Sequence, residues 1–251
     1  MIRFILTVIW VVGFLILSIP LFFAEWLIGK WNPKFRDISS LRIVQAAFKG
    51  VAFISGVKLT VIGEENIPKD QAVLYVGNHR SQFDIVLNYM RCPGLTGFVA
   101  KKELEKIPLL VNWMRYLYCL FLDRDNIKEG LKTILTAIDH VKNGISIMIF
   151  PEGTRNKNEN ELDLLPFHEG SFKIATKSGC PIIPVAISNS SALFEDHFPK
   201  IKAAPVVIEY GKPIDPKTLS REEQKFLGKQ VQEQIRAMLE KNQTLLQERQ
   251  K

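Results

Sequence analysis

A histidine and an aspartate five positions apart, His79 and Asp84, have side chains suited to acid–base chemistry. The apolar run 72–76 before them predicts a buried strand, and the amphipathic segment 85–90 after them predicts a short helix. On one continuous helix, five residues turn by about 140°, so the two side chains would diverge. They converge if His79 lies in the turn and Asp84 in the first helical turn. The carboxylate would then hold one ring nitrogen and leave the other as a base.

Ser81 permits a purely structural interpretation of the same stretch. As an N-cap, Ser81 would place Asp84 at the third helical position. A serine followed three residues later by an acid is also a capping-box pattern. Asp84 then merely caps the helix, and His79 is an ordinary loop histidine. The spacing alone leaves both interpretations open.

Further polar residues follow other apolar runs that predict strands. In open α/β sheets, ligands bind outside the carboxyl ends of the strands, so we expect these residues at one edge of the sheet. A guanidinium there can grip a phosphate in bidentate fashion, and a glycine lets the backbone approach a ligand. A solvated loop or a weak surface ion pair is the simpler explanation for each. The residues are Lys101, Arg124, Glu152, Gly153, Thr154 and Arg155.

The elements that must position these residues alternate between strands and helices after residue 57. Apolar runs predict strands at 58–62, 72–76, 97–100, 118–122, 145–150, 182–187 and 206–210. Helical spacing is clearest at 127–143, and an amphipathic helix from Ser220 to about Gln247 ends the chain. This alternation predicts an α/β domain over 57–251, with a mixed, largely parallel sheet flanked by helices.

Residues 1–56 predict N-terminal membrane-anchoring helices. Residues 4–24 carry no charge, and a bilayer core needs about 20 helical residues. No convincing cleavage site follows this stretch, which argues against a signal peptide. Pro20 permits a kinked, half-buried anchor in place of a spanning helix. A second helix, capped by Ser39 and Ser40 and running to about Ser55, would pack beside the first at the membrane surface.

The charge distribution bears on partners and orientation. Lys30, Lys34 and Arg36 follow the apolar stretch, whereas only Arg3 and the terminal amine precede it, so the main domain is expected on the cytoplasmic face. The net charge of +7 favours polyanions such as anionic lipid, phosphorylated substrates or nucleic acid. The three scattered cysteines include no C-x-x-C pair and indicate neither a disulfide framework nor a zinc site.

With these residues assembled, the chain resembles the glycerolipid acyltransferase family. The stretch 78–84 is similar to the N-H-x-x-x-x-D block of that family, and three further motifs follow in the same order. These are 121–124, 150–155 and 183–185. The resemblance covers roughly residues 40 to 215. It also implies the fold that the alternation of strands and helices predicts.

The resemblance implies acyl transfer from acyl-CoA or acyl carrier protein to the sn-2 hydroxyl of 1-acyl-glycerol 3-phosphate, giving phosphatidic acid in phospholipid biosynthesis. His79 would be the catalytic base and Asp84 would orient it. The acceptor site implied by the resemblance requires no metal and no cofactor. Its phosphate would be held by Lys101, Arg124 and Arg155, and its walls would include Glu152, Gly153 and Thr154.

Two alternatives stay open at this point. One is an acyltransferase for another lysophospholipid or for glycerol 3-phosphate. The other is a membrane-anchored protein that binds anionic lipid or nucleic acid without catalysis. Only the net charge supports it, and the cations are interspersed with acids, so we expect no nucleic-acid partner. Acyl-chain length, the choice of donor and the oligomeric state are left open.

Overall fold

The apolar runs of the sequence pair into a single seven-stranded sheet. The computed structural model of the protein describes residues 1–123 and 126–248. Its strands are β1 (Lys58–Ile62), β2 (Leu74–Gly77), β3 (Thr96–Lys101), β4 (Leu120–Leu122), β5 (Ser146–Ile149), β6 (Ile182–Ser188) and β7 (Pro205–Tyr210). Their spatial order is β1-β7-β6-β2-β5-β3-β4, and only the β6–β7 pair is antiparallel. The predicted mixed, largely parallel sheet is confirmed, with strand bounds within two residues of those predicted.

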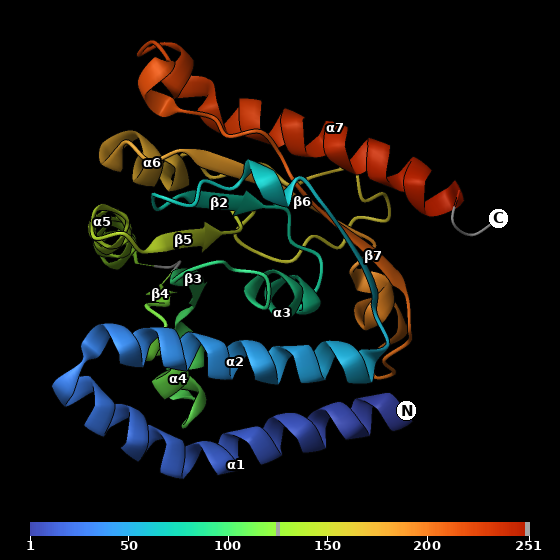
Figure 1. The fold of residues 1–251 in the computed structure, drawn as a ribbon. Coiled ribbons are helices and arrows are strands. Elements are labelled where there is room, and N and C mark those ends of the chain that lie inside the picture. Colours follow the sequence, from blue (N-terminus) through green and yellow to red (C-terminus); the bar gives the residue numbers. More distant parts are fainter. Residues whose placement is uncertain (124–125, 249–251) are drawn as a thin grey trace.

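Helices cover both faces of this sheet (Figure 1). They are α1 (Ile2–Trp31), α2 (Pro33–Ser55), α3 (Phe83–Tyr89), α4 (Leu110–Tyr116), α5 (Ile127–Lys142), α6 (Lys173–Ser178) and α7 (Leu227–Glu248). Every residue of β2 and of β6 is buried, because a parallel sheet covered on both faces has no solvated side. Tyr75 and Ile183 join the core on the side of α2 and α3, whereas Leu74 and Ile182 join the core on the side of α7.

The two N-terminal helices form an antiparallel hairpin along one face of the molecule (Figure 1). Both are long and apolar enough to cross a membrane. The two helices differ in packing. In the most apolar 18-residue stretch of α1, 6% is buried by protein, against 44% in the corresponding stretch of α2. The apolar surface of α1 is therefore mostly uncovered by protein, as the predicted membrane anchor requires.

The hairpin is also joined to the α/β domain by polar contacts. Gln45 of α2 donates to the backbone oxygens of Tyr89 and Cys92 at 3.2 and 2.8 Å. The buried indole of Trp113 in α4 donates to the Ser18 hydroxyl of α1 at 2.7 Å. The division at residue 56 thus marks a change in sequence character, while α2 contributes to the same core as the strands.

The start of the second helix was predicted wrongly. α2 begins at Pro33 and not near Ser39, because Asn32 accepts the Phe35 amide at 3.1 Å and the proline suits the first helical position. The hydroxyls of Ser39 and Ser40 instead donate to the buried carboxylate of Glu25 in α1, at 2.7 and 3.2 Å. These two serines join the helices of the hairpin rather than capping one.

The C-terminal helix also begins later than predicted. Ser220 and Glu223 do exchange the hydrogen bonds of a capping box, at 2.7 and 3.3 Å. A short 3-10 turn, η7 (Glu223–Phe226), follows before α7 starts at Leu227. The apolar stripe of α7, which includes Val231, Ile235 and Leu239, is fully buried against the sheet.

Candidate active site

The turn after β2 is held in place by the first residue of the motif, Asn78. Its side chain is fully buried and pairs with the backbone of β6. The Asn78 amide donates to the Ile187 oxygen at 3.0 Å and its oxygen accepts the Ile187 N–H at 2.8 Å. This two-point contact anchors the residue immediately before His79. Since β2, β6, β5, β3 and β4 all run in the same direction, their carboxyl ends lie at the same edge of the sheet.

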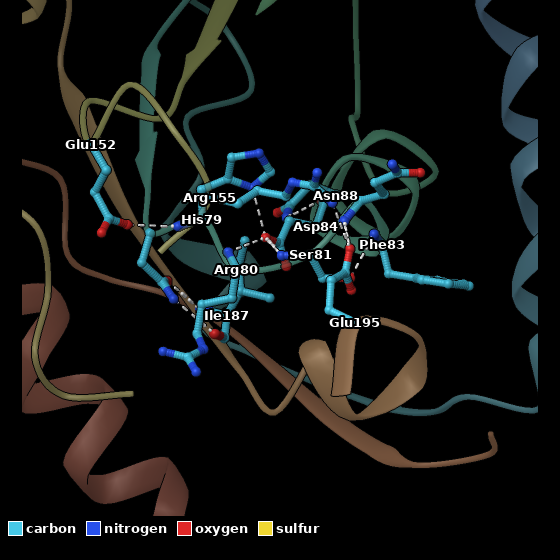
Figure 2. Close-up of polar contacts among 12 residues, drawn as sticks. His79, Arg80, Ser81, Phe83, Asp84, Asn88, Glu152, Arg155, Ile187 and Glu195 are labelled. Atoms are coloured by element: carbon cyan, nitrogen blue, oxygen red, sulfur yellow. Dashed lines mark hydrogen bonds and ion pairs between the residues drawn. The ribbon is translucent and has the colours of Figure 1, made fainter. Parts of the chain in front are cut away.

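His79 and Asp84 converge at this edge, as their spacing predicted (Figure 2). The distance from His79 Nδ1 to Asp84 Oδ2 is 2.8 Å. Oδ2 also accepts the backbone N–H groups of Arg80 and Ser81, both at 2.7 Å. An ionised carboxylate accepts from all three, so Nδ1 carries a proton and Nε2 is left as the basic nitrogen. Asp84 is fully buried, while the His79 side chain keeps 15% of its surface exposed.

The helix that carries the aspartate starts one residue later than expected. α3 begins at Phe83, so Asp84 is its second and not its third residue. Ser81 still supports the start, since its Oγ accepts the Phe83 N–H at 3.0 Å. The bond from the Ser81 amide to Asp84 is a cap, and the bond from His79 orients the ring. The capping contacts and the contact between His79 and Asp84 that catalysis would require are therefore both present, while catalysis by His79 stays a prediction.

Phe150, at the end of β5, supports the face of the histidine ring. The ring centroids of His79 and Phe150 lie 4.3 Å apart, with 17° between the planes. A stacked ring of this kind resists rotation about the bond that joins the imidazole to the chain. Together with the bond to Asp84, it leaves the imidazole one orientation.

The carboxylate of Glu152 is hydrogen-bonded to the backbone of His79. This carboxylate is buried, with one oxygen accepting the His79 N–H at 2.8 Å and the other accepting the Leu165 N–H at 2.9 Å. Burial raises the pKa of Glu152, and the two backbone donors oppose that shift. With both oxygens bonded to backbone N–H groups, Glu152 supports the turn that bears His79, and its role in substrate binding stays a prediction.

The next two residues shape the turn that follows β5. Gly153 has a φ of +71°, a region that L side chains rarely adopt. A β-carbon there would also lie 3.1 Å from the His168 ring, a tight contact that adds to the strain of the positive φ. Thr154 is exposed. The Asn156 amide then donates to the His79 oxygen at 2.7 Å, so the chain after the turn returns to the histidine.

Arg155 is held by a residue that the sequence analysis missed. Its Nη1 donates to Glu195 Oε1 at 3.0 Å, and the same oxygen accepts the backbone N–H of Gln82 at 2.9 Å (Figure 2). Glu195 lies in the connection after β6. One carboxylate thus ties the arginine to the segment that bears Asp84.

The predicted cation Lys101 makes its ion pair outside this cluster. Lys101 ends β3 at the same edge of the sheet, and its ammonium pairs with Glu103 at 3.0 Å. Both of these side chains are more than half exposed, at 56% and 59%. Arg124 lies outside the described residues. Within residues 1–123 and 126–248, no group of three or more His, Cys, Asp or Glu side chains is arranged to hold a metal ion.

A histidine held by a buried aspartate at the end of a buried strand makes this an α/β protein with a candidate acid–base site. The family model described as Acyltransferase matches residues 58–188. The matched segment covers His79, Asp84 and Arg155. The chain belongs to the Acyltransferase family.

Individual relatives agree with this assignment. The 1-acyl-sn-glycerol-3-phosphate acyltransferase of Borreliella burgdorferi is 32% identical over 203 residues, which cover 80% of this chain and 79% of that protein. The enzyme of the same name from Saccharomyces cerevisiae is 33% identical over 182 residues, 72% of this chain but only 59% of its own length. The crystal structure of PlsC, the LPA acyltransferase from Thermotoga maritima, superposes with a TM-score of 0.72 at 28% identity. That match covers 91% of this chain and 97% of the other.

Proposed function

We propose that this protein transfers a fatty acyl group from acyl-CoA or acyl carrier protein to the sn-2 hydroxyl of 1-acyl-glycerol 3-phosphate, giving phosphatidic acid for phospholipid biosynthesis. The observation that carries the proposal is the contact of 2.8 Å between His79 and the fully buried Asp84. This contact leaves Nε2 of His79 free to act as the base. Arg155, which contacts the same segment through Glu195, is suited to bind a phosphate. The names of the relatives agree with this acceptor.

The chemical step requires one base and no nucleophile from the protein. An alcohol near neutral pH is a poor nucleophile, so Nε2 of His79 removes its proton as the oxygen attacks the thioester carbonyl. Asp84 stays ionised and stabilises the imidazolium that forms. When the tetrahedral intermediate collapses, the carbon–sulfur bond breaks and the imidazolium returns the proton to the leaving thiolate. The products are the ester and the free thiol.

The acceptor would be oriented by its phosphate. The Arg155 guanidinium carries five N–H donors, and 40% of its side chain stays exposed while Nη1 contacts Glu195. A phosphate oxygen at this guanidinium would set the distance from the acceptor hydroxyl to Nε2 of His79. Arginine suits this role better than lysine, because its planar fork matches two phosphate oxygens at once.

The membrane anchor gives the reaction its location. Both the acceptor and the product carry acyl chains, and α1 exposes an apolar surface that protein does not cover. A site held at the cytoplasmic face lets a lipid acceptor enter without full transfer to water. The net positive charge of the chain adds attraction to anionic lipid.

A panel of donors and acceptors tests the proposal. Purified protein is mixed with oleoyl-CoA or oleoyl-acyl carrier protein and with one acceptor, and the released thiol is measured. We expect release with 1-acyl-glycerol 3-phosphate and much less with glycerol 3-phosphate or with a lysophospholipid that has a larger headgroup. Equal release with every acceptor would contradict the proposed specificity, and no release with any would contradict the proposed reaction.

A further inference from the structure

The connection between β6 and β7 lies against the membrane hairpin. It contains two 3-10 turns, η4 (Ser191–Leu193) and η5 (Glu195–His197), which lie close to the N-terminus of α1 in Figure 1. The Phe194 ring in this connection stacks on the Phe4 ring of α1, with centroids 5.8 Å apart and 13° between the planes. The connection is therefore continuous with the exposed apolar surface of α1.

A second aromatic side chain in this connection faces outward. Phe198 packs edge-on against Phe194, with centroids 5.4 Å apart, yet it keeps 72% of its surface exposed. A single exposed apolar side chain is ordinary, whereas a contiguous group marks an interaction surface. At the same end of the hairpin, Phe53 is 86% exposed and Ile2 is 75% exposed.

The three elements meet at Gly56, which follows α2. A β-carbon built on Gly56 would lie 3.0 Å from the Arg3 guanidinium and 3.2 Å from the Ala203 methyl. The start of α1, the end of α2 and the β6–β7 connection are thus within contact distance of one another. The exposed aromatic rings on them belong to one end of the molecule.

Cations border this group of apolar side chains. Arg3 lies on α1, and Lys200 and Lys202 follow Phe198 by two and four residues, all three being exposed. The nearby acids are engaged elsewhere. Glu195 accepts from Arg155 and Gln82, and Asp196 accepts the Ser191 hydroxyl at 3.1 Å. An apolar centre with a basic border is the pattern that binds an anionic lipid surface.

We infer that Phe198, Lys200 and Lys202 form a second membrane contact, which extends the apolar surface of the helical hairpin. The Phe198 ring enters the interfacial layer of the bilayer, where aromatic side chains are enriched, and Lys200 and Lys202 reach the lipid phosphates. Glu195 lies three residues before Phe198 and holds Arg155. This lipid contact therefore places the part of the site that contains Arg155 close to the membrane surface.

Fluorescence quenching at position 198 tests this contact. The variant Phe198→Cys carries a bimane label in full-length protein reconstituted into phosphatidylcholine–phosphatidylglycerol vesicles. The matched control is Phe226→Cys, because Phe226 is 64% exposed on η7, next to α7 on the opposite face of the sheet. The native thiols compete poorly for the label, since Cys92 and Cys180 are buried and burial raises the pKa of Cys119 to about 11.

We expect nitroxide-bearing lipids to quench the label at 198 and aqueous iodide to quench the label at 226. Replacing phosphatidylglycerol with phosphatidylcholine should weaken the lipid quenching at 198, because the lysines lose their anionic partners. Equal iodide quenching at the two positions would overturn the contact. Lipid quenching that is the same with and without phosphatidylglycerol would overturn the proposed binding of Lys200 and Lys202 to lipid phosphates. Neither readout depends on acyl transfer, so a failure here leaves the proposed function untouched.

Discussion

Glu152 accepts the backbone N–H of His79 at 2.8 Å, and this bond joins two motifs that lie 73 residues apart in the chain. The second oxygen of Glu152 accepts the Leu165 N–H at 2.9 Å, so the carboxylate bridges two backbone segments. The turn that bears His79 is therefore supported from outside its own motif. We therefore expect Glu152 to act through His79.

The variant Glu152→Gln should lower kcat and leave the KM for the acceptor little changed. A glutamine presents one acceptor oxygen to two backbone donors, so either the His79 or the Leu165 N–H loses its partner. Leaving a buried donor unpaired costs about 1–3 kcal/mol, which corresponds to roughly 5- to 150-fold in rate if the turn shifts. Steady-state thiol release measures the change. Glu159→Gln is the control, because Glu159 is exposed, and an equal loss in both variants would argue against the positioning role.

The structure separates two cations that the sequence placed together. Arg155 contacts the catalytic segment through Glu195, whereas Lys101 pairs with Glu103 on the surface. We expect Arg155→Ala to raise the KM for 1-acyl-glycerol 3-phosphate by roughly 10- to 100-fold, the range for a lost charge-assisted hydrogen bond. Lys101→Ala should change that KM by less than about threefold. If the two variants were equally impaired, Lys101 would share the phosphate site.

The carboxyl of Glu161 makes stability depend on pH. It accepts the Asn189 N–H at 2.9 Å, and burial raises the pKa of Glu161 above its usual range. A carboxyl with a raised pKa in the folded state contributes stability in its protonated form, and that contribution is lost as the pH rises through the folded-state pKa. Glu161→Gln stays neutral and keeps an acceptor oxygen for Asn189. Its Tm relative to the unsubstituted protein should therefore increase between about pH 4 and pH 7. A difference that stays flat over this range, measured by thermal melts, would contradict the burial of the charge.

We expect Asp84 to support catalysis by keeping the proton of His79 on Nδ1. In Asp84→Asn, the oxygen that accepts from His79, Arg80 and Ser81 loses its charge, and the ring loses its preferred tautomer. Removal of the orienting carboxylate in the comparable serine-protease triad lowers kcat by about 10⁴-fold, so we expect a fall of roughly 10³- to 10⁴-fold. The measurement is kcat across a pH series, with circular dichroism to verify the fold. A fall below about tenfold would show that Asp84 only caps α3.

The strand-end rule explains why much of the site could be predicted from the sequence. His79 follows β2, and Glu152 and Arg155 follow β5, and parallel neighbours bring their carboxyl ends together. The apolar runs that make these strands are buried on both faces, so their pattern is strong in the sequence. The residues at their ends then meet because of the topology, whatever the details of the loops.

The missed features depend on partners that are distant in sequence. Glu195 pairs with Arg155 across 40 residues, and Asn78 pairs with Ile187 across 109. No local pattern encodes such pairs. The backbone contacts of Glu152 were not predicted for the same reason, since a carboxylate at a strand end can face either a ligand or a backbone. The start of α2 was missed because Ser39 and Ser40 resemble a cap, while Glu25 of the preceding helix uses their hydroxyls.

The most direct test of the proposed mechanism is thiol release by His79→Ala with oleoyl-CoA and 1-acyl-glycerol 3-phosphate. The alanine removes the ring that contacts Asp84 and Phe150 but keeps the backbone N–H that Glu152 accepts. General-base catalysis contributes about 10²- to 10⁴-fold, so release should fall by at least the lower value while the melting temperature and membrane binding stay close to those of the unsubstituted protein. Release at an undiminished rate in a folded, membrane-bound variant would contradict the assignment of His79 as the catalytic base.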